Sequence, residues 1–186
     1  MNIDNSLKQS HFYIEKIIKP NSILVDATAG NGNDTLFLAH KIGEKGKIYS
    51  FDIQKVAIDF TMDKLMRDNL SEKVDLVLDS HENIDKYIKC KIDGAMFNLG
   101  YLPSGDHNIS TEYRSTIKAI DKLLLLLNKN GIITIVIYHG GDSGFEEKRN
   151  LLEYLEKLNN KEFNVMKTEF INQSNHPPIL ICIEKK

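Results

Sequence analysis

The sequence lacks the features that mark membrane, secreted and disulfide-stabilised proteins. Cysteine is scarce: Cys90 and Cys182 are the only two, and their separation fits neither a zinc site nor a redox pair. No apolar run approaches the roughly 18 residues of a membrane span, and the leucine run at 123–127 is far shorter. The N-terminal stretch "MNIDNSLKQSHFYIEK" has no basic segment followed by an apolar one, as a secretion signal would. We expect a cytoplasmic protein with reduced thiols and no membrane contact.

A large excess of charge of either sign is missing as well. The net charge is -2, with 27% charged and 41% hydrophobic residues, which is typical of a soluble globular protein. A nucleic-acid partner would therefore need a local basic patch. The candidate cations for such a patch are Lys8, Lys16, Lys19, Arg114, Lys118, Lys148 and Arg149. No repeat, low-complexity tract or linker divides the chain, so one domain over residues 1–186 is expected, and no residue pattern indicates a metal site.

Strand-like and helix-like stretches alternate along the chain. The strand-like runs that precede a helix or crossover are residues 22–28, 46–53, 73–80, 92–99 and 132–138. The helix-like stretches are residues 34–42, 54–69, 110–131 and 144–158. Ser110 is expected to cap the third helix and Gly131 to end it. The last two strand-like runs, 163–171 and 178–185, lack a helix between them and should pair antiparallel. The pattern predicts an α/β fold with helices on both faces of a mainly parallel sheet.

A glycine-containing loop follows the first expected strand. In "VDATAGNGNDT" (residues 25–35), Gly30 and Gly32 allow the backbone to approach a ligand closely. The third glycine of the dinucleotide fingerprint is missing, because Thr35 occupies its position. Asp26 ends the strand before the loop, and Asp52 ends the next strand, where a carboxylate can accept hydrogen bonds from ribose hydroxyls. These features predict a nucleotide-type ligand.

The carboxylates around the loop favour a cationic ligand over a dinucleotide. Asp34 stands at the start of the following helix, where its charge would repel a pyrophosphate. S-adenosylmethionine has no phosphate and carries a sulfonium and an ammonium group, which suit Asp26 and Asp34. A seven-stranded sheet that ends in an antiparallel hairpin also resembles the class I S-adenosylmethionine-dependent methyltransferases. In that class the end of the third strand holds the adenine, and here Ser80 and His81 follow Asp79 at that place.

The fourth expected strand ends in "NLGYLP" (residues 98–103), which resembles the Asn-Pro-Pro-aromatic motif of amino-directed methyltransferases. Asn98 and a nearby carbonyl would orient the target nitrogen, and Tyr101 would stack on its base, a contact worth ~1–3 kcal/mol. Leu99 and Gly100 replace the two prolines, which makes adenine N6 a less favoured target. Because transfer is an in-line displacement, placing a neutral nitrogen at the methyl group supplies most of the catalysis. If a base removes a proton from the amine, the candidates are Asp106, His107 and His139.

The loop after the fifth strand, "YHGGDSG" (residues 138–144), leaves the sheet at the same expected edge. Its glycines permit close approach of a substrate. The residues predicted to contact substrate are Tyr101, Asp106, His107, Tyr138, His139, Gly140 and Gly141.

Six motifs together are similar to those of a family of small bacterial proteins named as rRNA methylases. They are "VDATAGNGNDTLFLA", "FDIQ", "DSHENI", "FNLGYLPSGDH", "YHGGDSGFEE" and "NHPP". Members are understood as tRNA methyltransferases of the MnmM type, which methylate the 5-aminomethyl group of (2-thio)uridine 34. The resemblance implies S-adenosylmethionine as donor, a tRNA anticodon stem-loop as acceptor and a homodimer. A flexible alkylamine would tolerate the looser Leu-Gly turn.

Carried over to this sequence, the resemblance assigns donor contacts to three strand ends. It implies donor contacts at Asp26, Gly30, Asn31, Asn33, Asp34, Asp52, Gln54, Ser80 and His81. Asn98, Tyr101 and residues 138–141 would meet the uridine.

Two alternatives stay open at the level of sequence. The protein could methylate another amine or amide nitrogen in DNA, a protein or a small molecule. It could also be a nucleotide-binding module without catalysis, although binding alone would use neither Asn98 nor Tyr101.

Overall fold

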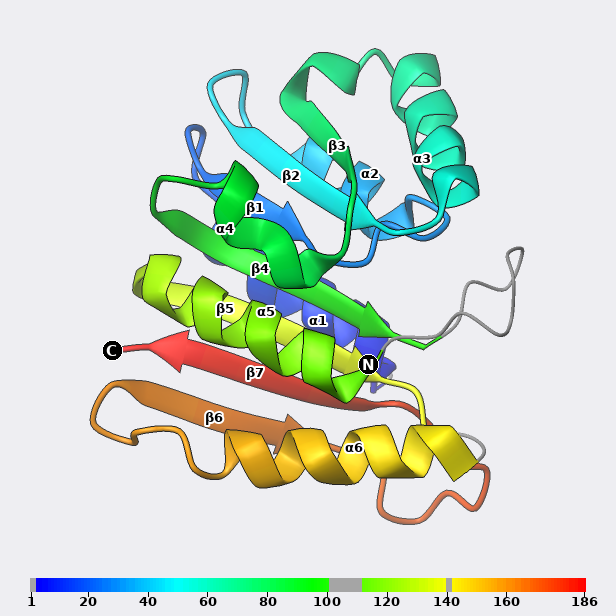
Figure 1. Ribbon diagram of the computed structural model, residues 1–186, viewed down its shortest axis with the longest axis vertical. Helices are drawn as coiled ribbons and strands as arrows, with labels where there is room; N and C mark the ends of the chain where they lie inside the picture. The colour runs from blue at the N-terminus through cyan, green and yellow to red at the C-terminus, as the bar shows by residue number, and fades with distance from the viewer. Residues whose placement is uncertain (1–2, 101–111, 140–141) are drawn as a thin grey trace.

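The computed structural model describes residues 3–100, 112–139 and 142–186, within which seven strands form one sheet (Figure 1). The strands are β1 (Ile23–Asp26), β2 (Lys47–Asp52), β3 (Val74–Leu78), β4 (Ile92–Leu99), β5 (Leu127–Ile137), β6 (Phe163–Thr168) and β7 (Ile179–Lys185). The helices are α1 (Ser6–Glu15), α2 (Asn33–Lys41), α3 (Lys55–Arg67), α4 (Ile84–Tyr87), α5 (Tyr113–Leu126) and α6 (Asp142–Leu155). Two 3₁₀ turns, η1 (Ser71–Lys73) and η2 (His81–Asn83), flank β3.

The strand order is β3-β2-β1-β4-β5-β7-β6. Strands β1 to β5 are mutually parallel, and β7 runs antiparallel to both of its neighbours, β5 and β6. This arrangement confirms the predicted α/β fold with its C-terminal antiparallel hairpin. The chain reverses its direction of winding between β1 and β4, and open α/β sheets bind ligands beside the carboxyl ends of the strands at such a point.

The two faces of the sheet are covered by different helices. Helices α4, α5 and α6 pack on one face, where Phe97, Ile120 and Leu151 are among the fully buried side chains. On the other face α1, α2 and α3 pack around buried residues that include Ile14 and Leu38. Strands β4 and β5 lie in the middle and are covered on both faces. Polar side chains occur in β4 only at Asp93 and Asn98, and in residues 132–137 of β5 only at Thr134, as buried parallel strands require.

Helix α1 was not predicted from the sequence. Its buried stripe is Ser6, Ser10 and Ile14, so the apolar repeat that would indicate an amphipathic helix is largely missing. The helix is instead held by polar contacts: the Ser10 hydroxyl lies 2.8 Å from Oγ1 of Thr134 on β5. Its N-terminus is capped by the side chain of Asn5.

The predicted end of the third expected helix, at Gly131, is wrong. Helix α5 ends at Leu126 and β5 begins at once, with an irregular register in which Ile92 and Gly94 of β4 pair with Leu127 and Ile132. Gly131 is needed inside this irregular strand, because a Cβ there would lie 2.8 Å from a backbone carbonyl oxygen. The expected cap, Ser110, lies outside the described residues. None of the described helices is long and apolar enough to span a bilayer.

Candidate functional site

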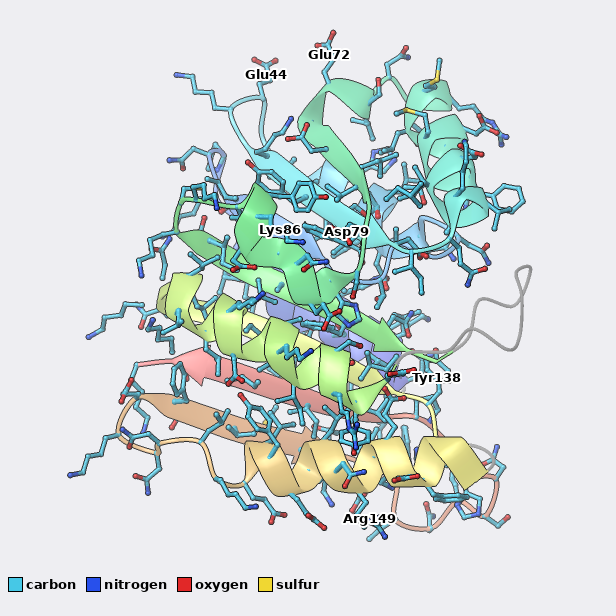
Figure 2. The ribbon with its side chains drawn as sticks, in the orientation of Figure 1. Glu44, Glu72, Asp79, Lys86, Tyr138 and Arg149 are labelled. Atoms are coloured by element: carbon cyan, nitrogen blue, oxygen red, sulfur yellow. The ribbon has the colours of Figure 1, made fainter. Side chains whose placement is uncertain are left out.

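A cavity of about 750 Å³ opens at the carboxyl ends of the parallel strands. Loops that follow β1, β2, β3, β4 and β5 supply most of its wall, and α1 and α5 contribute the rest. Figure 2 shows Tyr138 beside the ends of β4 and β5, and Asp79 beyond the end of β3. The predicted site residues on its wall are Gly30, Asn31, Asn33, Asp34, Asp52, Gln54, Ser80, His81, Asn98 and Tyr138. The wall residues that sequence reasoning missed include Leu7, Thr28, Ile53, Glu112 and Ser115.

The glycine loop is tied to the neighbouring strands by its own backbone. The amide of Ala29 donates to the Phe51 carbonyl at 2.8 Å, and that of Gly30 to Oδ2 of Asp52 at 2.9 Å. Gly30 lines the cavity in a left-handed conformation (φ 51°), consistent with its predicted role. Gly32 has a different role, because it is not on the cavity wall and a Cβ there would lie 2.8 Å from the Thr61 hydroxyl. It therefore permits α2 and α3 to pack closely.

Asp26 lies beneath the loop and is fully buried. One carboxylate oxygen accepts from the Thr28 amide at 3.1 Å and the other from the Thr35 hydroxyl at 2.6 Å. Burial, followed by repulsion from Asp34, raises the pKa of Asp26 from 3.8 to about 7. The side chain is not on the cavity wall, and its hydrogen bonds join it to Thr28 of the loop and Thr35 of α2. Its predicted contact with the donor stays a prediction.

Asp52 sits at the end of β2 with its carboxylate already oriented. It accepts from the amides of Gly30 and Gln54, each at 2.9 Å. A carboxylate has about four acceptor positions, so these two bonds fix the group while leaving capacity for a ligand hydroxyl. Ile53, which follows it, lines the cavity with its side chain 55% exposed and offers an apolar surface to a flat ring.

His81 brings a buried acceptor to the cavity. Its Nδ1 lies 3.0 Å from the Ala27 carbonyl, so this nitrogen carries the hydrogen. Burial lowers the pKa of His81, which keeps the ring neutral and leaves Nε2 as an acceptor. Among the described residues Nε2 has no hydrogen-bond partner although it is buried. An unpaired buried polar atom is costly and commonly marks a site that a ligand completes.

Asn98 ends β4 on the cavity wall, and its backbone amide donates to the Thr28 hydroxyl at 2.8 Å. Its side-chain Nδ2 donates to Oδ2 of Asp34 at 3.3 Å, and Oδ1 of Asp34 lies 2.6 Å from Nε2 of His11. His11 belongs to α1, so sequence reasoning missed it together with its helix. The signal that could have found it is the Asn5 cap, which marks a helix start five residues before Ser10.

His139, predicted as a catalytic and substrate-binding residue, is not on the wall of the described cavity. The side chain is 4% exposed and packs edge-on against the rings of Phe145 and His176. Nε2 lies 3.2 Å from the Lys148 ammonium group, and burial lowers the pKa of the ring. Successive residues after a strand point to opposite sides, so Tyr138 reaches the cavity and His139 does not.

Some predicted residues cannot be placed on the structure. Tyr101, Asp106, His107, Gly140 and Gly141 lie outside the described residues, so their roles stay predictions. Of the candidate cations, Lys118 pairs with Glu82 at 2.9 Å, and Arg149 projects from α6 away from the sheet (Figure 2). In the ranges that the structure covers, no three acidic, histidine or cysteine side chains come together to hold a metal ion.

The family is shown by comparison with known proteins. A model of the family described as "Putative rRNA methylase" matches residues 48–184, most of the chain. The chain belongs to this family. The predicted family and the predicted enzyme class, a methyltransferase, are thereby confirmed.

Solved structures and a curated relative resemble the methylase over nearly its whole length. A "putative rRNA-methylase" from Clostridium thermocellum is 55% identical with a TM-score of 0.99, and the match covers 100% of both chains. A "putative methyltransferase" from Streptococcus mutans, solved in complex with SAH, is 40% identical with a TM-score of 0.92 over 100% of both chains. The chloroplastic tRNA (mnm(5)s(2)U34)-methyltransferase of Arabidopsis thaliana is 28% identical over 95% of this chain and 68% of its own length.

Proposed function

We propose that this methylase transfers a methyl group from S-adenosylmethionine to the 5-aminomethyl nitrogen of (2-thio)uridine 34 in a tRNA anticodon loop. The observation that carries the proposal is the side chain of Asn98, which lies on the cavity wall with its amide nitrogen engaged by Asp34. Its side-chain oxygen can accept a hydrogen bond from an amine. The name of the Arabidopsis relative supports the choice of nucleoside, and the RNA-methylase family supports RNA as the substrate class.

The residues of the cavity fit S-adenosylmethionine, and the volume of about 750 Å³ suits a ligand of that size. Asp34 and Asp52 line it with negative charge, which favours a donor that carries a sulfonium and an ammonium group. The unpaired Nε2 of His81 can accept from an exocyclic amine such as that of adenine. None of the residues that line the described cavity is a lysine or an arginine, so its wall offers no cation to a pyrophosphate.

The protein groups act mainly by placement. S-adenosylmethionine supplies an electrophilic methyl group on a positively charged sulfur. Asn98 accepts an N–H of the incoming neutral amine through Oδ1 and so directs the nitrogen lone pair toward the donor site. As the nitrogen gains positive charge in the transition state, this hydrogen bond strengthens, and the fixed amide lowers the barrier without reorganising.

The acceptor RNA reaches the cavity past side chains from several elements. Tyr138, Glu112 and Ser115 form the part of the wall nearest to β5 and α5. Tyr138 is 44% exposed, so its ring offers a surface on which a base can stack. We include in the proposal that the protein works as a cytoplasmic homodimer. Light scattering of the purified protein would test the dimer, and a single-chain mass would refute it.

Nucleoside mass spectrometry tests the proposal directly. Deletion of the gene should leave 5-aminomethyl-(2-thio)uridine in bulk tRNA, and the purified protein with S-adenosylmethionine should convert that tRNA in vitro. An unchanged nucleoside profile, or no methyl transfer to the deletion-strain tRNA, would refute the assigned substrate. Transfer to another nucleic acid, protein or small amine in the same assay would favour the alternative methyltransferase function.

A further inference from the structure

Helix α1 is held rigidly against the sheet. Ser10 hydrogen-bonds to Thr134 in the buried interior, and the Ser6 hydroxyl donates to the Pro178 carbonyl before β7. These contacts join the start of the chain to strands more than a hundred residues away. Because His11 follows Ser10 directly, its backbone position is fixed by the same contacts.

The side chain of His11 is held from two sides by α2. Its Nε2 lies 2.6 Å from Oδ1 of Asp34. Its ring is stacked on Phe37, with centroids 3.9 Å apart and planes 5° from parallel. A carboxylate only accepts hydrogen bonds, so Nε2 carries the hydrogen and donates it. Asp34 is only 5% exposed, and this bond holds its carboxylate from the α1 side.

Asp34 in turn distinguishes the two ends of the Asn98 amide. Its Oδ2 accepts from Nδ2 of Asn98 at 3.3 Å, whereas Oδ1 of Asn98 would be repelled. At 3.3 Å this hydrogen bond is longer than the usual 2.7–3.2 Å range, so a small displacement of Asp34 would break it. The orientation of Asn98 therefore depends on where Asp34 is held.

We propose that His11 is a positioning residue for methyl transfer: it holds Asp34 so that the carbonyl oxygen of Asn98 stays turned toward the attacking nitrogen. The inference rests on the proposed function, because it concerns the group that orients the amine. His11 itself is 24% exposed and is not on the cavity wall, so it acts through Asp34 rather than on the substrate.

Helix α2, which carries Asp34, offers a matched control. His40, near the end of α2, places its Nε2 2.7 Å from Oδ2 of Asp68, so it forms a histidine–aspartate pair of the same geometry. Both partners are exposed, at 52% and 37%, and neither lies on the cavity wall. If the loss of any histidine–aspartate pair that involves α2 lowers the activity, then His40→Ala should lower it as well.

The test combines kinetics with a readout that needs no RNA. In His11→Ala, kcat should fall about tenfold, since misplaced reacting groups lose rate, while KM for tRNA and Kd for S-adenosylmethionine stay within about twofold. His11→Gln can still donate to Asp34 and should recover most of the lost kcat. His40→Ala should match the wild type. Unchanged kcat in His11→Ala, or an equal loss in His40→Ala, would overturn the proposal.

The second readout is the side-chain amide of Asn98 itself. In protein labelled with ¹⁵N-asparagine, the Nδ2 resonances of Asn98, assigned by their loss in Asn98→Ala, should shift in His11→Ala and return toward the wild-type position in His11→Gln. No shift in His11→Ala would reject the positioning role whatever the substrate is. If the wild type fails to methylate the tRNA while the amide shifts as expected, the assigned substrate fails and the positioning role is upheld.

Discussion

The two halves of the sheet differ in strand direction and in the surroundings of their polar groups. In the half formed by β3, β2, β1 and β4, polar groups at the strand ends face a cavity, and Nε2 of His81 is buried there without a described partner. In the half formed by β5, β7 and β6, His139 is just as buried, yet both of its nitrogens have neighbours and its ring packs against other rings. Burial and neutrality are common to both histidines. They differ in that Nε2 of His81 has no described partner and can accept from a ligand, whereas both nitrogens of His139 have protein neighbours.

The topology explains the difference. Strands β3, β2, β1 and β4 deliver their carboxyl ends, and the loops that follow, to one place beside the switch point between β1 and β4, and β5 adds Tyr138. The antiparallel β7 brings its amino end to that edge instead. Apart from Tyr138, which directly follows β5, the strands β5, β7 and β6 add nothing to the described cavity wall. Other substitutions in this half should therefore change stability more than ligand binding.

The largest effect is expected for Asn98→Ala in the cavity half. Turnover should fall about 100-fold, as when a fixed hydrogen-bonding group of a transition state is removed, while the Kd for S-adenosylmethionine stays near normal. Asn164→Ala is the control from the other half, since that amide also donates to a carboxylate, Glu184, at 2.9 Å. Kinetics with tRNA from the deletion strain and calorimetry with the donor measure both quantities. Full turnover in Asn98→Ala would remove this side chain from the mechanism.

His81→Leu and His139→Leu test the comparison most directly. His81→Leu should weaken S-adenosylmethionine binding about tenfold, because the loss of one buried acceptor removes ~1.4 kcal/mol. His139→Leu should leave that affinity unchanged. Calorimetry measures the affinity of both variants for S-adenosylmethionine. A weaker affinity in His139→Leu would show that the β5, β7 and β6 half also contributes to donor binding.

Asp26→Asn tests whether burial and the charge of Asp34 raise the pKa of Asp26 in the folded protein. Because the pKa of Asp26 is about 7 when folded and 3.8 ordinarily, the folded state binds the proton more tightly. The stability that this proton provides is complete below pH 3.8 and is lost as the pH rises through 7, with a slope of at most ~1.4 kcal/mol per pH unit. Urea denaturation should show the wild type losing stability relative to Asp26→Asn over this window.

Asp85→Asn is the contrasting variant for that experiment. Lys122 holds the pKa of Asp85 below its usual range, so the stability from this carboxylate is lost only as the pH falls below 3.8. If the free energy of unfolding changes with pH in the same way in Asp26→Asn and in the wild type, the pKa of Asp26 is not raised in the folded protein.

The smallest effect is expected for the stability of His139→Leu. The variant gives up the contact with Lys148 and a long hydrogen bond to the Ile137 carbonyl at 3.4 Å. We expect the free energy of unfolding to fall by about 1 kcal/mol. Urea denaturation measures it, and His81→Leu provides the comparison at a similarly buried histidine.

The strand ends were predictable because parallel strands all terminate at one edge. Asp52 is the last residue of β2, Asn98 is the second-to-last of β4, and His81 follows β3. The sheet brings the three to one cavity. The direction of a side chain after a strand was harder to predict. It depends on a two-residue alternation, so a shift of one position exchanges Tyr138 and His139.

The contribution of α1 could not be predicted for a different reason. Its buried face uses serine hydroxyls that bond to β5 and to the residue before β7, and these partners are distant in sequence. Local patterns show apolar periodicity but not long-range polar contacts. Sequence reasoning therefore found Asp34 and missed His11, the residue that supports it.

The placement of α1 has a practical consequence for anyone who labels or immobilises the protein. Leu7 already lies on the cavity wall, whereas β7 runs in reverse and ends at Lys185 on the opposite edge of the sheet (Figure 1). An affinity tag or fluorophore joined after Lys186 would lie far from the cavity, while one fused ahead of α1 would lie close to its wall and could obstruct the binding of a ligand.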